Sequence, residues 1–193
     1  LNGDEIEKET TEIKWDAEAA EKAGFEHFMM KEIYEQPKAI RDTLNSVVKD
    51  GVIDFTDIDI TEEEIKKYSQ IYIVACGSAW HVGVEAQYVI EEMAQIPVRV
   101  ELASEFRYRE MPLVKDGLVI VVSQSGETAD TLAAMRMAKD KGLATLAVVN
   151  VIGSSIAREA DKVFYTLAGP EISVATTKGY SCLLYTSPSP RDS

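Results

Sequence analysis

Short apolar runs alternate with amphipathic stretches between residues 65 and 170, and this alternation predicts the fold. We expect strands at residues 71–75, 98–102, 118–122, 144–149 and 162–167, and helices at residues 80–94, 128–141 and 154–159. Strands that are apolar at successive positions and separated by helices are typical of a parallel sheet covered on both faces. The pattern therefore predicts an α/β fold with a doubly wound parallel sheet, and it shows no internal repeat.

Residues 1–64 have a different pattern, which predicts a linker and helices ahead of the sheet. Residues 1 to about 25 are acidic and weakly periodic. Apolar residues then recur at roughly helical spacing, namely Phe28, Ile33, Ile40, Leu44 and Val47. Because Pro37 cannot continue a helix, we expect two short helices that meet near it, the second ending at Gly51. The three glutamates after Thr61 predict the first turn of a further helix.

The last eleven residues, 183–193, differ again, since two prolines and three serines among them exclude a helix or an interior strand. We expect this tail to be disordered and non-native. The chain opens on Leu1 without the basic and apolar regions of a signal peptide, so we expect the parent protein to start upstream. The expected organisation is a linker with helices over residues 1–64, one α/β domain over residues 65–182, and the tail.

Charge and composition narrow the function. Asp and Glu number 33 against 20 Lys and Arg, which gives the 193-residue chain a formal net charge of −13. Nucleic acids and anionic membrane surfaces require a basic face, so we expect neither as a partner. No apolar run approaches the roughly 18–20 residues of a membrane-spanning helix. A small phosphorylated ligand held by neutral donors is compatible with this charge.

The two cysteines, Cys76 and Cys182, have neither CxxC nor metal-ligand spacing. A disulfide scaffold is therefore not expected, and the sequence favours a reducing, cytoplasmic location without a metal site. We expect Cys76 to be a small packed residue.

The loop after the third expected strand carries the densest chemistry. It reads Ser-Gln-Ser-Gly-Glu-Thr at residues 123–128 and leads into a helix. Hydroxyls beside a helix N-terminus form a seat for a compact dianion such as a sugar phosphate, with no need for a lysine or a metal. The alternative is that Ser125 and Thr128 only cap the helix. A Walker loop and a Gly-x-Gly-x-x-Gly motif are both absent from the sequence.

Two other strand ends carry polar residues. After the first strand, the turn that begins at Cys76 leads into a helix, where we expect Trp80 to pack and His81 to be structural or solvated. After the fifth strand comes a Gly-Pro loop. Glu171 in that loop is a candidate acid or base, and Lys178 is a candidate amine nucleophile. The alternative for both is a solvated loop charge, which is the more common case.

These motifs together resemble a known family. Ser-Gln-Ser-Gly-Glu-Thr-Ala-Asp-Thr-Leu at residues 123–132 resembles the sugar-phosphate loop of sugar isomerase (SIS) domains. Residues 27–37, the Cys76-Gly turn, residues 149–159 and residues 168–178 resemble, more narrowly, the isomerizing glutamine–fructose-6-phosphate aminotransferases, or glucosamine-6-phosphate synthases. The likeness runs in register from about Trp15 to Cys182. Two of these segments, residues 27–37 and 168–178, are together specific to the synthases.

The resemblance implies an activity and a set of binding residues. The family converts fructose 6-phosphate and glutamine into glucosamine 6-phosphate and glutamate without a metal or redox cofactor. Its members join a glutaminase domain to two SIS subdomains, and this chain resembles the linker and the first SIS subdomain. The implied phosphate ligands are Ser123, Gln124, Ser125 and Thr128, and the implied sugar contacts are Ser78, Val174 and Thr176. The parent is expected to be a cytoplasmic homodimer.

The chain departs from the family pattern at three points. Ala79 stands where the family commonly has a serine, which removes one sugar-contacting hydroxyl, and Thr176 stands where serine is more common. After Cys182 the tail replaces an expected apolar helix. The family's general base, ring-opening histidine and Schiff-base lysine have no counterpart here, and Lys178 does not match that lysine by position. The resemblance therefore implies no catalytic residue in this chain, and we expect it to be inactive alone.

Two other functions are compatible with an SIS-type loop. One is a non-catalytic module that senses a phosphosugar, as in regulators, although the sequence shows no basic recognition helix. The other is a short aldose–ketose sugar-phosphate isomerase, which would not carry the linker up to Pro37.

Overall fold

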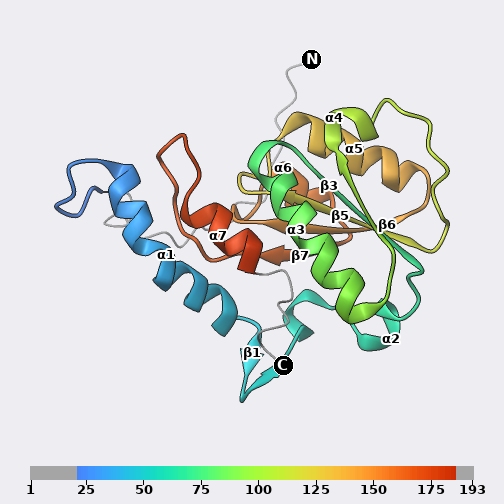
Figure 1. Ribbon diagram of the computed structural model, residues 1–193, viewed down its shortest axis with the longest axis horizontal. Helices are drawn as coiled ribbons and strands as arrows, with labels where there is room; N and C mark the ends of the chain where they lie inside the picture. Colours follow the sequence, from blue (N-terminus) through green and yellow to red (C-terminus); the bar gives the residue numbers. More distant parts are fainter. Residues whose placement is uncertain (1–20, 186–193) are drawn as a thin grey trace, which may run out of the picture.

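The computed structural model describes residues 21–185 and contains a five-stranded parallel sheet (Figure 1). The strands are β3 (Gln70–Ala75), β4 (Val98–Leu102), β5 (Gly117–Ser123), β6 (Ala144–Val149) and β7 (Lys162–Tyr165), in the order β4-β3-β5-β6-β7. All neighbouring pairs are parallel. The doubly wound α/β fold is confirmed, and every strand ends within two residues of its expected limits.

Helices cover both faces of this sheet. One face carries α3 (Gly77–Ala94) and α7 (Lys178–Tyr185), and the other carries α4 (Ala103–Phe106), α5 (Ala129–Asp140) and α6 (Ser155–Glu159). Along β3, Tyr72 and Val74 join the apolar cluster under α5, while Ile71 and Ile73 join the cluster under α3. Two-sided burial explains the unbroken apolar run. Within residues 21–185, none of the helices has both the length and the apolar character needed to cross a bilayer.

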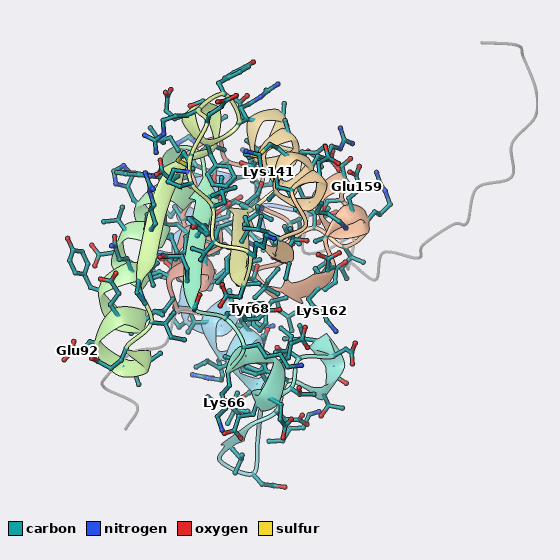
Figure 2. All side chains as sticks on the ribbon, turned by 90° about the vertical axis from the view of Figure 1, so that its right-hand side faces the viewer. Lys66, Tyr68, Glu92, Lys141, Glu159 and Lys162 are labelled. Atoms are coloured by element: carbon teal, nitrogen blue, oxygen red, sulfur yellow. The ribbon has the colours of Figure 1, made fainter. Side chains whose placement is uncertain are left out.

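The strand order reverses between β3 and β5. From β3 the chain adds β4 on one side, then returns to add β5, β6 and β7 on the other. Because α3 and α5 leave β3 and β5 toward opposite faces, a crevice opens beyond Ala75 and Ser123 at the carboxyl edge of the sheet. Tyr68, which precedes β3, and Lys162, which opens β7, mark the opposite, amino-terminal edge (Figure 2).

A single helix, α1 (Phe28–Asn45), runs through Pro37, so the expectation of two short helices is wrong. Proline at this position removes the N–H that would bond the carbonyl of Ile33. The side chain of Gln36 replaces that donor, because its Nε2 lies 3.1 Å from the Ile33 carbonyl oxygen. Packing of α1 along α7 also stabilises a helix that its local sequence would interrupt.

A β-hairpin follows α1 in place of the expected helix end at Gly51. Its strands are β1 (Val48–Lys49) and β2 (Val52–Ile53), and the short turns η2 (Thr56–Ile58) and α2 (Glu62–Ile65) come next. Asp50 and Gly51 have φ angles of 54° and 77°, the conformation that Asp-Gly favours in a two-residue hairpin turn. The expected helix start after Thr61 is confirmed, since its hydroxyl accepts a hydrogen bond from the Glu64 N–H at 3.2 Å.

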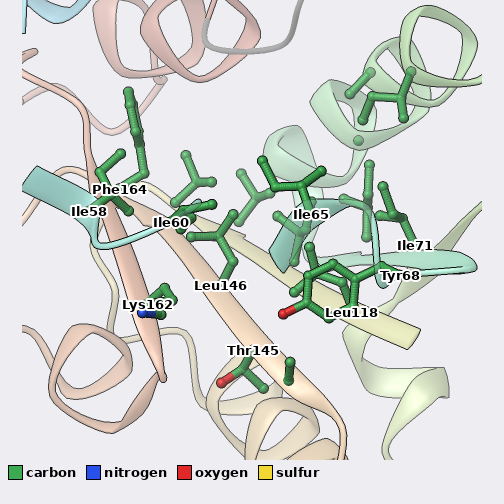
Figure 3. A pocket seen from close by; sticks show the side chains of 18 of the residues that line it. Ile58, Ile60, Ile65, Tyr68, Ile71, Leu118, Thr145, Leu146, Lys162 and Phe164 are labelled. Atoms are coloured by element: carbon green, nitrogen blue, oxygen red, sulfur yellow. The ribbon is translucent and has the colours of Figure 1, made fainter. Parts of the chain in front are cut away.

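An apolar groove of about 320 Å³ lies on the α3 face of the sheet, against β5, β6 and β7 (Figure 3). Its walls include Ile58, Ile60, Ile65, Leu118, Leu146 and Phe164. Among the described residues, the helices packed against β6 are α5 and α6, and both lie on the other face, which leaves this face open. The groove presents few polar groups, so it does not suit a phosphorylated ligand.

The chain does not leave the fold at residue 183, which corrects the expected start of the tail. Helix α7 continues to Tyr185, and both Cys182 and Leu183 are buried. Leu183 belongs to the apolar cluster under α3. The expectation of disorder is wrong here because Cys182 and Leu183 are apolar and pack into the core, whereas the prolines come only later in the chain. Those prolines, within residues 186–193, lie outside the described residues.

We expect Leu183→Ala to lower the free energy of unfolding by about 2–4 kcal/mol, because it deletes a buried side chain from a packed cluster. Leu183 is 3% exposed, whereas its neighbour Leu184 is 36% exposed. Leu184→Ala is therefore the matched control and should cost less than about 1 kcal/mol. Urea unfolding of the two variants provides the measurement, and equal costs would contradict the placement of α7.

Candidate functional site

A cavity of about 180 Å³ with several hydroxyl groups in its wall lies at the crevice between the carboxyl ends of β3 and β5. Its walls come from the turn after β3, the loop after β5 and the loop that leads into α7. Six of the seven predicted site residues line it, namely Ser78, Ser123, Gln124, Ser125, Thr128 and Thr176. Segments far apart in the sequence therefore meet at the one edge where the topology leaves room for a ligand.

Val174 is the predicted site residue that the structure places outside the cavity. Its side chain is fully exposed and is not part of the cavity wall. The reason lies in the backbone, because the N–H groups of Ile172 and Ser173 both bond to Glu32 on α1. This contact draws the loop toward α1 and leaves the next side chain pointing to solvent.

Hydroxyl groups in the loop after β5 line the cavity and have protons that are not used within the loop. The oxygens of Ser123 and Ser125 accept hydrogen bonds from the N–H groups of Gly126 and Glu127, at 3.1 and 3.2 Å. Ser123 and Thr128 share one further bond, with 3.0 Å between their oxygens. A hydroxyl carries one proton and two lone pairs. Three hydroxyls with one shared proton therefore leave two protons available for an anion.

Thr128 does not cap α5 with its side chain. It occupies the N-cap position of the helix, but its hydroxyl makes no capping bond and contacts Ser123 instead. Ser125 bonds an N–H that precedes the helix. The capping alternative is therefore wrong for Thr128 and does not account for Ser125. The first N–H groups of α5 lack a side-chain cap, and the positive end of the helix dipole adds to the donor character of the loop.

The loop is braced against α6 through two backbone contacts. The carbonyl oxygen of Gly126 accepts from the Ile156 N–H at 3.0 Å, and Glu127 Oε1 accepts from the Ser155 N–H at 2.7 Å. The bond from Ser155 holds the pKa of the Glu127 carboxyl below its usual value. Gly126 has a φ of 65°. A Cβ at that position would lie 2.0 Å from Ser154 Oγ, so only glycine fits this close approach.

Among the described residues that line the cavity, none has an ionised side chain. An anion there would be held by neutral hydroxyls, backbone N–H groups and the helix dipole. Within residues 21–185, no group of His, Cys, Asp or Glu side chains is arranged to hold a metal ion. The local chemistry therefore suits recognition of a phosphate ester.

The turn after β3 forms another wall of the cavity, beside the β5 loop. Ser78 is exposed and Ala79 presents a methyl group, so this wall offers one hydroxyl. Cys76 is half-buried and also lines the cavity, with its sulfur 3.7 Å from the Thr131 hydroxyl, so the expectation that it is merely a packed residue is incomplete. Trp80 packs against the apolar cluster under α3, as expected, and His81 is exposed.

Two charged loop residues considered as catalysts serve the structure instead. Glu171 accepts hydrogen bonds from the Thr176 hydroxyl and from the N–H groups of Thr177 and Gly179, at 2.9, 2.8 and 3.1 Å. Lys178 is 3% exposed and its Nζ lies 2.7 Å from Glu35 Oε2. Neither of the two expected alternatives, catalyst or solvated charge, describes these contacts.

The role of α1 in the site was not predicted from the sequence. Glu32 is 2% exposed and accepts bonds from the backbone of Ile172 and Ser173 and from the Ser173 hydroxyl. Glu35, one turn further on, pairs with Lys178. A signal was available, because residues 27–37 and 168–178 are both segments that the resemblance singles out. Their mutual contact is visible only in the fold.

Asn150 joins the loop after β5 to the loop that leads into α7. Its N–H donates to the Gln124 carbonyl oxygen at 3.1 Å. Its side chain donates to the Gly169 carbonyl oxygen at 2.8 Å and accepts from the Ala168 N–H at 2.9 Å. One buried residue at the end of β6 therefore sets the distance between the phosphate-type loop and the loop that carries Thr176.

Residues 64–186 match the SIS domain family, and this chain belongs to that family. A glutamine–fructose-6-phosphate aminotransferase (isomerizing) from Clostridium acetobutylicum is 60% identical over 185 residues, which cover 95% of this chain and 30% of the relative. Its counterpart from Methanosarcina mazei is 49% identical over 180 residues, or 92% of this chain and 29% of the relative. These relatives confirm the resemblance stated from sequence. The chain spans about 30% of the length of the curated relatives it matches.

Solved structures agree with this assignment. The C-terminal domain of glucosamine-fructose-6-phosphate aminotransferase from Francisella tularensis superposes with a TM-score of 0.82 at 43% identity, covering 86% of this chain and 47% of that one. The sugar isomerase domain of an RpiR transcription factor from Sphaerobacter thermophilus has a TM-score of 0.62 at 20% identity, covering 82% of this chain and 85% of that one. At that identity the second likeness concerns the fold alone.

We expect Gly126→Ala to lower the free energy of unfolding by about 3 kcal/mol or more, because a Cβ there collides with Ser154 and is strained at positive φ. Gly142→Ala is the matched control. Gly142 has a φ of 80°, and a Cβ added to it would meet nothing within 4 Å, so strain alone applies, about 1–2 kcal/mol. Equal losses for the two variants in denaturant unfolding would show that α6 does not brace the loop.

Proposed function

We propose that this chain is the sugar-phosphate-binding module of an isomerizing glutamine–fructose-6-phosphate aminotransferase. The observation that carries the proposal is the set of two available hydroxyl protons beside the N-terminus of α5. That arrangement complements a phosphate dianion without a lysine or a metal. The relatives named above support fructose 6-phosphate as the sugar phosphate concerned.

The proposal assigns two parts of the cavity wall to the two parts of the ligand. Ser123, Gln124, Ser125 and Thr128 hold the phosphate, and Ser78 and Thr176 contact the sugar. The proposal leaves Val174 outside the site, because its side chain points to solvent. Because Ala79 has no hydroxyl group, Ser78 supplies the hydroxyl of the turn after β3.

The proposal extends to the parent protein. Its activity is the synthesis of glucosamine 6-phosphate and glutamate from fructose 6-phosphate and glutamine, in a cytoplasmic homodimer. Residues 1–64 serve as the linker and N-terminal helices of the isomerase half, and the first SIS subdomain runs from residue 65 to at least residue 185, the end of α7. The contacts of α1 with the loop before α7 support a linker that is built into the binding module.

We expect the chain to bind fructose 6-phosphate and to bind fructose at least tenfold more weakly, because the loop after β5 is complementary to the phosphate. Ser125→Ala should weaken fructose 6-phosphate binding by roughly 10- to 100-fold, since it removes a charge-assisted hydrogen bond of about 1.5–3 kcal/mol. Isothermal titration calorimetry provides the measurement.

The matched control for that experiment is Ser155→Ala, which removes a hydroxyl outside the cavity wall and keeps the Ser155 N–H that bonds Glu127. Its affinity should stay within twofold of the native chain. Equal affinity of the native chain for fructose and fructose 6-phosphate would remove the phosphate from the proposed function.

We also expect no glucosamine 6-phosphate from the purified 193-residue chain supplied with fructose 6-phosphate and either glutamine or ammonia. The resemblance assigns the base, the ring-opening group and the Schiff-base lysine to sequence that does not match these residues. Chromatographic detection of the product would show that the chain contains catalytic groups of its own.

A further inference from the structure

Two parts of the cavity wall offer different hydrogen-bonding groups, and we call them the β5 end (Ser123, Ser125 and Thr128) and the sugar end (Thr176). At the β5 end, two hydroxyl protons are available as donors. At the other end, the hydroxyl of Thr176 has already used its proton, because Oγ1 donates to Glu171 Oε2 at 2.9 Å. Since a hydroxyl has only one proton, Thr176 offers lone pairs alone to a ligand.

The orientation of Glu171 is itself fixed by the backbone. Its Oε1 accepts from the N–H groups of Thr177 and Gly179, at 2.8 and 3.1 Å. A Cβ on residue 179 would lie 2.6 Å from Glu171 Oε2, so glycine at that position permits the close approach. With Oε1 occupied by two backbone donors, Oε2 is left to receive the proton of Thr176. Glu171 itself is not part of the cavity wall.

We propose that Glu171 is a specificity-determining positioning residue that makes the sugar end of the cavity select a ligand hydroxyl as a hydrogen-bond donor. The carboxylate acts through Thr176, which it turns into an acceptor. The inference rests on the proposed function. A ligand with an anion at one end and a hydroxyl at the other satisfies both ends of the cavity. A ligand that places an acceptor beside Thr176 brings its own lone pairs against those of the Thr176 hydroxyl, and no hydrogen bond forms.

Glu171→Gln tests the proposal with little change in shape. The amide oxygen of the substituted side chain keeps the two backbone bonds, and its amide nitrogen donates to Thr176 Oγ1. The threonine proton must then point into the cavity, which reverses the polarity of that end. Calorimetry should show fructose 6-phosphate binding about tenfold more weakly to the variant, whereas the affinity for inorganic phosphate stays within twofold.

Fluorinated ligands report the polarity directly, because fluorine in place of a hydroxyl accepts weakly and cannot donate. Among the monodeoxyfluoro analogues of fructose 6-phosphate, at least one should bind the native chain about tenfold more weakly than the parent sugar. The same analogue should come within twofold of the parent sugar in Glu171→Gln. A structural defect alone would lower both affinities together and would not remove the difference between them.

Thr176 supplies the matched pair of variants. Thr176→Ser keeps the hydroxyl and should keep fructose 6-phosphate affinity within twofold, whereas Thr176→Val should lose about tenfold and make Glu171→Gln silent when the two are combined. A folded Glu171→Gln variant with native affinity and native analogue discrimination would overturn the proposal. So would a parallel loss of affinity for inorganic phosphate, or native affinity in Thr176→Val.

If Glu171→Gln does not fold, as judged by its melting temperature and circular dichroism, the Thr176 pair decides. Loss in Thr176→Val with retention in Thr176→Ser supports the proposal, and equal affinities overturn it. Failure of the proposed function gives a different result, because the native chain would then bind fructose and fructose 6-phosphate equally.

Discussion

The site depends on two buried or half-buried carboxylates that hold a loop by its backbone. Glu32 on α1 and Glu171 at the start of the loop before α7 each accept bonds from two backbone N–H groups and one hydroxyl. A carboxylate removed from water must be paired with donors, and loop N–H groups removed from water must be paired with acceptors. The carboxylates and the loop N–H groups satisfy each other, so a loop without regular structure acquires a defined shape. That shape places Thr176 in the wall of the cavity that the hydroxyls after β5 also line.

An acidic chain with a net charge of −13 is an unexpected host for an anion. For the phosphate ester that we propose, the cavity offers a helix dipole and hydroxyl protons in place of cations. Ser123 and Ser125 each accept one N–H of their own loop, and Ser123 and Thr128 share one proton, so two of the three hydroxyl protons stay available to a ligand. The nearby lysine, Lys178, is buried in a pair with Glu35 and does not line the cavity. Such a site discriminates by geometry, because its strength does not come from net charge.

Helix α1 is joined to the wall of the cavity by the same kind of contact, because its Glu32 holds the loop that carries Thr176. Helices α1 and α7 pack together, and the buried Lys178 links them through Glu35. Pro37 would weaken α1 in isolation, but the Gln36 side chain compensates for the lost backbone donor. The apolar groove on the α3 face differs from these polar contacts in chemistry, since it is lined mainly by aliphatic side chains. In the described part of the chain, the hydrogen-bonding groups of the candidate site therefore lie at the carboxyl edge of the sheet, and the apolar groove lies on the α3 face.

The sequence by itself determined the sheet, the helices α3, α5 and α6, and most of the residues that line the candidate site, but not α4 or α7. Strands buried on both faces need apolar residues at successive positions, and the hydroxyls of the candidate site follow such a strand directly. Both signals come from residues adjacent in the sequence. Tertiary structure decided the path of α1 through Pro37, the burial of Leu183, the exposure of Val174 and the roles of Glu32, Glu171 and Lys178. Several of these depend on a contact between segments distant in the chain, more than a hundred residues apart for Glu32 and Ile172. Local propensity contains no information about such contacts, because a charged residue is stable in solvent or in a buried pair, and only the fold selects between them.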